Sequence, residues 1–168
     1  DDGKTYNSTD NGTNWNYVYS GVDKDFKGVA YGNNLFVAVG QDGKILTSTD
    51  NGNTWIKLTT TNPLNGGPDL NGISFGNNTF VAVGIKQNNA TYGAIGTSTD
   101  GTTWTLRTSS IPNDINGVTY GNSTFVAVSD AGKIITSVNL TAWTSRTSGI
   151  TNNINGITYG NSTFVAVG

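Results

Sequence analysis

The sequence predicts an all-β protein built from repeated four-stranded antiparallel units, and three observations support this prediction. Short alternating or apolar runs are separated by Gly-rich turns along the chain, and no segment shows a helical period of useful length. Two motifs recur four times each and interleave. All four Trp fall at one position of the second motif, 40, 49 and 39 residues apart. Four strands in a period of 39–49 residues are typical of the blades of a β-propeller, which is the fold that we expect.

The first motif is a turn followed by an apolar run. Gly-Asn-Ser-Thr-Phe-Val-Ala-Val occurs letter for letter at 121–128 and 160–167, and looser copies occur at 32–39 and 76–83. Because four apolar residues follow one another, this strand needs cover on both faces, which an isolated four-stranded sheet does not give. Blades stacked face to face give it.

Each period contains four expected strands in a fixed order. In the third copy they are 117–120, which alternates, the apolar run 124–128, a second alternating run at 133–137, and the short strand 143–146. Asp-Gly and Asn-Gly pairs suit the positive φ of the tight turns between them. The blades of a single propeller domain, 1–168, are therefore expected at roughly 28–59, 72–108 and 117–147, with a fourth made from 156–168 and completed by 4–19.

The fourth blade is expected to be split between the two termini, a velcro-type closure. Residues 4–19 supply the third and fourth strands of a blade, and 156–168 supply the first and second. Completion within one chain gives a four-bladed ring, and completion between two chains gives an eight-bladed homodimer. We expect the homodimer, because a four-bladed ring needs blades much narrower at the axis, where large Tyr or Phe side chains recur.

The second motif is Ser-x-Asp-x-Gly-x-Thr-Trp, which 48–55 matches at every position. Asn14 replaces Thr in the first copy, the third is one residue shorter, and the fourth has Asn139 for Asp and no Gly. The motif resembles the Asp-box, or BNR repeat, of sialidase-like β-propellers. The resemblance implies that each copy forms the turn between the third and fourth strands, with Ser and Asp bound to local backbone and Trp packed into the blade. The structural residues are then Ser8, Asp10, Gly12, Trp15, Ser48, Asp50, Gly52, Trp55, Ser98, Asp100, Trp104, Ser137 and Trp143.

A calcium site is the alternative role for Asp10, Asp50 and Asp100. The structural role is favoured, because each turn offers one carboxylate where a calcium loop offers several. No metal and no cofactor is expected. The degenerate fourth copy predicts that Trp143 tolerates substitution best among the four Trp.

The composition narrows the possible chemistry. The chain has no His, Cys or Met, and its 11 acidic residues are all Asp, which excludes Ser-His and Cys-His nucleophile pairs, ordinary zinc sites and disulfides. A net charge of −2 with 9 Lys+Arg gives no basic surface for nucleic acid, and no window approaches the roughly 20 apolar residues that span a bilayer. Abundant Thr, Asn, Ser and Gly favour a secreted or cell-surface protein, unless the chain is engineered.

Ligand binding is expected on the loops that vary between blades, because packing explains the strand residues. These loops are the turns between second and third strands and the crossovers between blades. Arg107 and Arg146 also have a simpler interpretation as solvated charges that protect an edge strand. The aromatic residues Tyr31, Phe75, Tyr120 and Tyr159 recur at one position, where inter-blade core is favoured over sugar stacking. The candidate ligand-binding residues are Asp23, Asp25, Asp69, Lys86, Tyr92, Arg107, Asp114 and Arg146.

The predicted function is that of a non-enzymatic binding or scaffold module for a carbohydrate or a protein. A sialidase-like site needs an Arg cluster and a Glu, whereas this chain has two Arg and no Glu. The alternative is a glycoside hydrolase with paired Asp, drawn from Asp23, Asp25, Asp69 and Asp114. A further alternative is a designed or recently amplified repeat protein without a ligand, since the copies are nearly identical.

Overall fold

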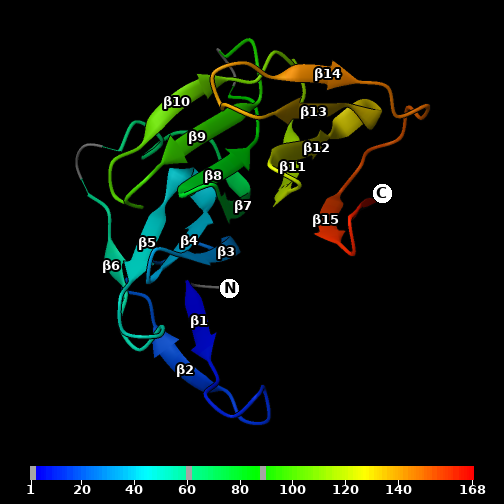
Figure 1. The fold of residues 1–168 in the computed structure, drawn as a ribbon. Coiled ribbons are helices and arrows are strands. Elements are labelled where there is room, and N and C mark those ends of the chain that lie inside the picture. The colour runs from blue at the N-terminus through cyan, green and yellow to red at the C-terminus, as the bar shows by residue number, and fades with distance from the viewer. Residues whose placement is uncertain (1–2, 60–61, 88–89) are drawn as a thin grey trace.

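The computed structural model describes residues 3–59, 62–87 and 90–168, which form three four-stranded antiparallel sheets and two β-hairpins (Figure 1). The first sheet has the order β3 (Phe26–Gly32), β4 (Leu35–Gly40), β5 (Ile45–Ser48), β6 (Ile56–Lys57). The second has the order β7 (Leu70–Gly76), β8 (Thr79–Gly84), β9 (Ala94–Ser98), β10 (Thr105–Thr108). The third has the order β11 (Ile115–Gly121), β12 (Thr124–Ser129), β13 (Ile134–Ser137), β14 (Thr144–Arg146). The predicted all-β architecture of four-stranded antiparallel sheets is confirmed.

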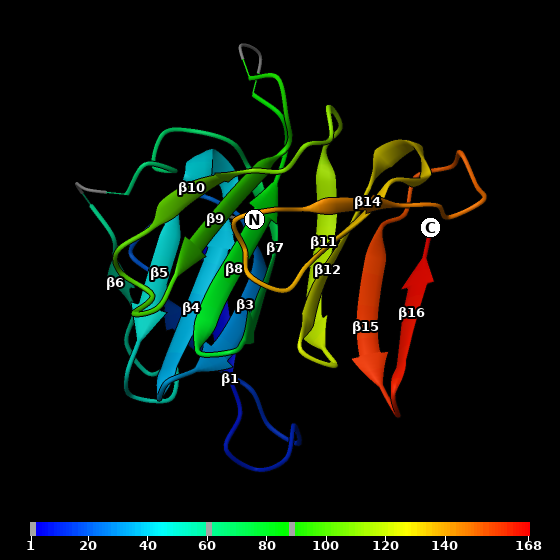
Figure 2. The ribbon, with the colours of Figure 1, turned by 45° about the horizontal axis from the view of Figure 1, so that its top comes forward.

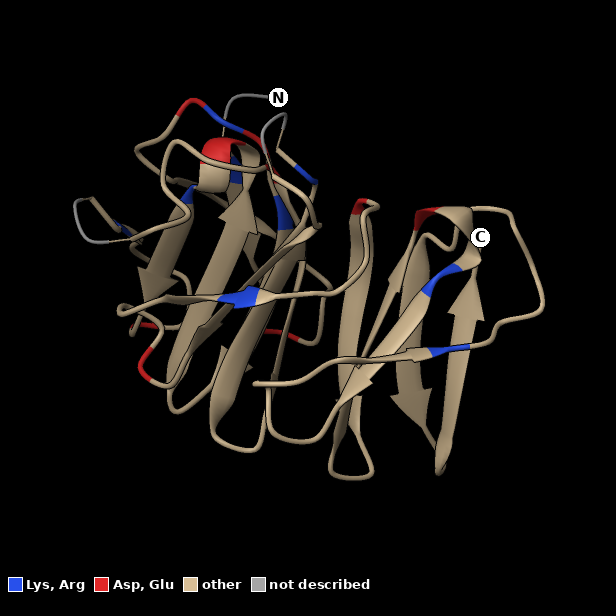
Figure 3. Ribbon diagram, turned by 90° about the horizontal axis from the view of Figure 1, so that it is seen from above, with Lys and Arg blue, Asp and Glu red and all other residues tan. Residues whose placement is uncertain are grey.

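The sheets stand side by side with their first strands toward the inside of an arc. Neighbouring first strands contact one another in sequence: β3 lies beside β7, β7 beside β11, and β11 beside β15 (Gly156–Gly160) (Figure 2). Short 3-10 turns, Gln41–Gly43 and Asp130–Gly132, connect the second and third strands of the first and third sheets. Most acidic residues lie in the turns and crossovers at the strand ends (Figure 3). No helix in the described part of the chain is long and apolar enough to cross a membrane.

The core lies between neighbouring sheets. The central strands β4, β8 and β12 are buried on both faces, as the uninterrupted apolar motif predicts. Between the first and second sheets the buried cluster is Val37, Val39, Ile45, Leu64, Leu70, Phe80, Ala82 and Trp104. Between the second and third sheets it is Val81, Val83, Ile95, Ile111, Ile115, Val118, Phe125, Ala127, Ile135 and Trp143.

The first-strand aromatic residues fill the inner part of these interfaces. The ring of Phe75 covers Gly32 of the preceding sheet, and Tyr120 covers Gly76 in the same way. A Cβ at either Gly would overlap the ring, so the absence of a side chain is what permits this contact. These large rings therefore occupy the space between neighbouring first strands.

The two terminal hairpins of one chain form separate sheets, so the four-bladed ring closed within one chain is not observed. β1 (Lys4–Asn7) pairs with β2 (Asn16–Tyr19), and β15 pairs with β16 (Thr163–Val167), each as a separate two-stranded sheet. The hairpins lie at opposite ends of an open arc (Figure 1). Residues 156–168 are therefore not completed by 4–19 of the same chain.

Candidate functional site

Three turns between third and fourth strands share one hydrogen-bond pattern. The Ser8, Ser48 and Ser98 hydroxyls donate to Oδ1 of the Asp two residues later, at 2.8, 2.8 and 2.9 Å. In the first two turns the Gly N–H, of Gly12 and Gly52, donates back to the Ser Oγ at 3.0 and 2.9 Å. These side chains satisfy backbone groups of their own turn, which is a structural role.

The Asp carboxylates of these turns accept further backbone N–H groups. Asp10 and Asp50 each accept the N–H four residues later at 2.9 Å. Asp100 accepts the N–H groups of Thr102 and Thr103 at 2.8 and 2.7 Å. In the degenerate fourth turn, Asn139 Oδ1 replaces the carboxylate and accepts two N–H groups at 3.1 and 3.2 Å. An amide oxygen therefore holds the turn that lacks Asp.

Hydrogen bonding lowers the pKa of these carboxyl groups. The backbone N–H and side chain of Asn14, with the Ser8 hydroxyl, lower the pKa of Asp10 to about 2. The hydroxyl and N–H of Thr54 lower the pKa of Asp50 to about 2. Partial burial raises the pKa of Asp100, but hydrogen bonds from the Thr103 and Thr102 N–H groups outweigh it and hold this pKa below its ordinary range.

We expect Asp50→Asn to make the melting temperature less dependent on pH. Because the folded-state pKa lies below the unfolded value of 3.8, Asp50 stabilises the fold above about pH 4 and loses that contribution as the pH falls toward 2. The variant should melt lower than the parent at pH 7, and the two should converge near pH 2. Calorimetry from pH 7 to pH 2 measures this difference. Asp23→Asn, at an exposed loop position, is the control, and an equal effect there would contradict the assignment.

The four Trp do not follow the predicted ranking. Trp143 is 6% exposed and packs in the core between the second and third sheets, so the prediction that it is the most tolerant is wrong. Trp104 is 4% exposed, whereas Trp15 in the terminal hairpin is 63% exposed. Burial of the ring depends on a neighbouring sheet and not on how well the turn matches the motif.

Two candidate ligand residues connect neighbouring sheets. Asp69 Oδ1 accepts the N–H of Asp42 in the preceding sheet at 3.0 Å, and its Oδ2 lies 3.2 Å from Lys27 Nζ. Asp114 Oδ1 accepts the N–H of Lys86 at 2.7 Å. The Asp42 N–H, more than Lys27, lowers the pKa of Asp69. Asn153 binds the N–H of Ala131 in the same way at 3.1 Å, so one crossover position connects successive sheets in each case.

The structure separates the remaining candidates. The main chain of Asp25 exchanges hydrogen bonds with Gln41, and Asp23 is exposed in the same crossover. The Lys86 side chain is exposed beyond the bond that its N–H makes. Arg146 lies on β14 and donates from Nε to Thr136 Oγ1 at 2.9 Å. Besides the hydrogen-bonded pair Asp114 and Lys86, the structure brings Tyr92 and Arg107 to one place beside the second sheet.

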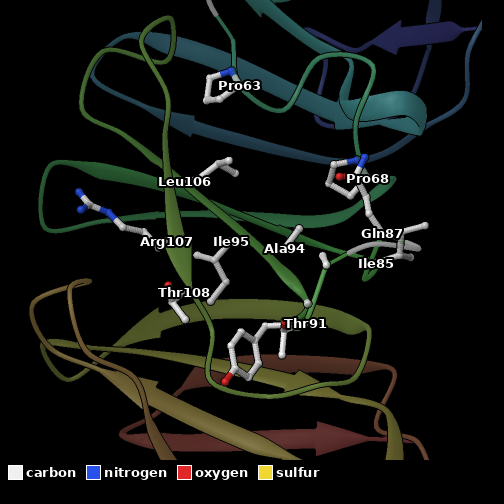
Figure 4. Close-up of a pocket in the computed structure, with 13 residues that line it drawn as sticks. Pro63, Pro68, Ile85, Gln87, Thr91, Ala94, Ile95, Leu106, Arg107 and Thr108 are labelled. Carbon is white, nitrogen blue, oxygen red and sulfur yellow. The ribbon is translucent and has the colours of Figure 1, made fainter.

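Tyr92 and Arg107 line a cavity of about 260 Å³ beside β9 and β10 (Figure 4). Leu106, Arg107 and Thr108 of β10 lie on one side of it, with Ile85 and Gln87 opposite. Pro63 and Pro68 border one end and Thr91 the other. The lining is mainly apolar with a few polar groups, which is the usual composition of a ligand pocket. Its full lining is Pro63, Pro68, Ile85, Gln87, Ala90, Thr91, Tyr92, Gly93, Ala94, Ile95, Leu106, Arg107 and Thr108.

Two loops that depart from the repeat build this cavity. The turn between second and third strands has four residues in the first and third sheets, 41–44 and 130–133, but nine in the second, 85–93. The crossover into the second sheet, 58–69, has twelve residues, whereas the crossover into the third, 109–114, has six. Specific binding is expected where a repeated frame is interrupted, because the repeated residues are already explained by packing.

Arg107 gives the cavity its one cation. Its Nε–H donates to Thr97 Oγ1 at 3.0 Å, as Arg146 does to Thr136 in the third sheet. Within the described residues, the Nη groups of Arg107 make no hydrogen bond or ion pair, so they are available to a ligand carboxylate. Leu106, which is 52% exposed, was not predicted from the sequence, because it lies in a strand whose side chains were assigned to packing.

The comparisons with known proteins agree with this architecture. No family model matches the chain, and no curated protein matches it. Among solved structures, it is similar to YCF48 bound to D1 peptide, with a TM-score of 0.65, 16% identity, and coverage of 85% of this chain and 48% of that one. It is also similar to YCF48 from Cyanidioschyzon merolae, with a TM-score of 0.61, 18% identity, and coverage of 85% of this chain and 49% of that one. For the computationally designed Ika8 protein the TM-score is 0.65 and the identity 14%, with coverage of 99% of this chain and 52% of that one.

At these identities the similarity concerns the fold alone, which is that of a β-propeller. The chain spans about half the length of each of these three structures.

Proposed function

We propose that the chain is an Asp-box propeller that acts as a non-enzymatic binding module, taking a segment of another protein in the cavity beside β10. One observation carries this proposal: the two longest departures from the repeat, 58–69 and 85–93, converge on one cavity. A repeat protein without a ligand gives no reason for both insertions to meet.

The chemistry of the cavity favours an extended peptide. Pro63, Pro68, Ile85 and Leu106 offer apolar surface, and Arg107 offers a guanidinium at its side. β10 is the outer strand of its sheet, so its free edge can pair with an added strand. A segment with an apolar side chain next to an acidic residue fits both features. The similarity to a propeller solved with a bound peptide supports this class of ligand.

The Asp residues support a non-enzymatic role. A paired-Asp hydrolase needs one carboxylate free to accept or donate a proton and another free to act as base or nucleophile. Asp69 and Asp114 instead bind N–H groups of different sheets, and each connects a crossover to a turn. Because both carboxylates connect neighbouring blades, Asp69 and Asp114 are poor candidates for the catalytic pair of a glycoside hydrolase.

We also propose that the working form is a homodimer, in which two arcs make one eight-bladed ring. The open arc and the unpaired terminal hairpins support this assembly. Such a ring would carry two copies of the β10 cavity, and two linked peptide sites would bind a repeated ligand more tightly than one site.

The test is selection from a displayed library of random peptides, followed by affinity measurements on the variants Arg107→Ala and Arg146→Ala. The two arginines make the same Nε bond on equivalent strands, but the long turn 85–93 accompanies only Arg107. We expect selected peptides to combine apolar and acidic residues. Arg107→Ala should weaken them about tenfold or more by removing a charged hydrogen bond, while Arg146→Ala should not.

Three outcomes would contradict the proposal. Equal losses of peptide affinity in Arg107→Ala and Arg146→Ala would place the binding site elsewhere. If the protein binds to a glycan array and no peptide is selected from the library, the ligand is a carbohydrate and not a protein segment. Turnover of a glycoside panel, abolished by Asp69→Asn, would restore the hydrolase alternative.

A further inference from the structure

One apolar strand is exposed although an identical copy of it is buried. Residues 121–128 and 160–167 have the same sequence. Val126 and Val128 of β12 are 6% and 0% exposed, whereas Val165 and Val167 of β16 are 54% and 64% exposed. Because the two segments are identical, the difference comes from their neighbours. β12 pairs with β11 on one edge and with β13 on the other, whereas β16 pairs only with β15 among the described strands.

The strand that would fit this edge is β1. The hairpin β1–β2 carries the third and fourth strands of a blade and lacks the first two. In the complete sheets the motif Ser always pairs with the Phe of the second strand, as Phe36 with Ser48, Phe80 with Ser98 and Phe125 with Ser137. The same register places Phe164 opposite Ser8, and Val165 opposite Asn7.

The inner wall has a second matching gap. The ring of Tyr159 covers Gly121, as Tyr120 covers Gly76 and Phe75 covers Gly32. The fourth Gly of this series, Gly160, has open space where the next ring would lie. The fourth aromatic residue, Tyr31, is 55% exposed at the other end of the arc. If Tyr31 covered Gly160, each Gly of the repeat would be covered by the aromatic ring of the next sheet.

A third series of contacts between neighbouring sheets also ends at the β15–β16 hairpin. Asn71 donates from its side chain to the carbonyl of Ile115, and Asn116 donates to that of Ile154, each at 3.0 Å and each from one sheet to the next. Asn155, directly before β15, holds the equivalent sequence position, and the carbonyl at the equivalent of Ile154 belongs to Phe26. A hydrogen bond from the Asn155 side chain to the Phe26 carbonyl would continue this series of contacts between sheets.

The space for these contacts is present beside the first sheet. A groove of about 260 Å³ separates the terminal hairpin from β3, and Tyr6, Phe26, Val29 and Trp55 are among the residues that line it. Val29 is 61% exposed there, whereas Val118 at the equivalent position of the third sheet is 8% exposed. The groove lies where the first two strands of a blade would stand.

We propose that β15–β16 of a second copy fills the groove between β1–β2 and β3, pairing β16 with β1 in the register Val165 to Asn7 and stacking Tyr31 on Gly160. The occupant is a second copy because the two hairpins of one chain lie at opposite ends of the arc. Two equal seams then close the ring around a two-fold axis. This inference rests on the proposed homodimer and adds its contacts.

The test uses disulfides, because the chain has no native Cys to interfere. Paired residues of antiparallel strands have Cα atoms about 4.5–5.5 Å apart, within the range that a disulfide spans. Protein carrying Asn7→Cys is mixed with protein carrying Val165→Cys and oxidised. We expect covalent dimers that contain one copy of each variant. Mixing Thr5→Cys with Val165→Cys, which is two residues out of register, is the control and should give few.

Two results would overturn the seam. A doubly substituted chain, Asn7→Cys with Val165→Cys, that forms its disulfide within one monomer would show closure inside a single chain. Absence of the disulfide while the protein remains dimeric would show that the homodimer exists through another face, so failure of the seam and failure of the homodimer are distinguishable.

A Gly substitution tests the inner contact without a crosslink. Gly160→Val has open space in a single chain but would displace Tyr31 of a second copy. We expect the dimer to dissociate at least about tenfold more readily, while the melting temperature of the dissociated chain stays unchanged. Gly121→Val is the matched control, because its side chain would overlap Tyr159 of the same chain and lower that melting temperature. An unchanged dimer in Gly160→Val would overturn the contact.

Discussion

Replacing Trp104 with Ala is expected to lower the free energy of unfolding by about 3–5 kcal/mol. The side chain is 4% exposed and packs with Leu64 and Phe80 in the core between the first and second sheets. Its Nε1–H donates to the Gly101 carbonyl at 3.1 Å, so the substitution also removes a hydrogen bond. Urea denaturation measures the change.

The control for this prediction is Trp104→Phe, which keeps an aromatic ring in the core and should lose clearly less than the Ala variant. If both variants unfold within about 1 kcal/mol of the parent protein, the ring does not hold the two sheets together.

Phe125→Ala is expected to destabilise the chain by about 3–5 kcal/mol, and Phe164→Ala by much less in a single copy. The two Phe stand at the same place in identical segments, but Phe125 is 1% exposed, whereas Phe164 is half-buried in the otherwise exposed strand β16. Their aromatic partners match as well, since Tyr120–Phe125 and Tyr159–Phe164 both have centroids 4.6 Å apart. The burial of the ring by neighbouring sheets is what differs.

The measurement is chemical denaturation of both variants over a range of protein concentrations. The effect of Phe125→Ala should not depend on concentration. The effect of Phe164→Ala should grow as the chain assembles, because the second copy would then cover this ring. Equal and concentration-independent losses would show that β16 is already covered within one chain.

The sequence predicts the repeated parts of the fold because their causes are local. The apolar motif that ends at Val128 and the alternating run before Ser137 specify two paired strands. The hydrogen bonds of Ser48 and Asp50 lie within eight residues of chain, so the motif alone is enough to predict that turn.

The parts that sequence reasoning missed depend on how sheets are placed relative to one another. Asp69 and Asp114 look like exposed loop carboxylates, and only the position of the preceding sheet shows that they bind its backbone. Trp143 has a poor turn motif but a well-packed neighbour. Val126 and Val165 have identical local sequences and different exposure, which no local pattern can distinguish.

The candidate cavity was predicted only in part for the same reason. Tyr92 and Arg107 were selected because they interrupt or flank the repeat, and the structure brings them together with Leu106. The length of the turn 85–93 was the signal in the sequence. That this turn and the crossover 58–69 line one cavity beside β10 depends on how the first two sheets stack, which the sequence alone does not show.

The central claim is that one chain is half of a ring and that a second copy completes it. Light scattering coupled to size-exclusion chromatography measures the molar mass in solution directly. The account predicts about twice the chain mass of 17.6 kDa, falling toward a single chain only on dilution or in Gly160→Val. A mass of 17.6 kDa at every concentration, with no dimer even in the most concentrated sample, would contradict it.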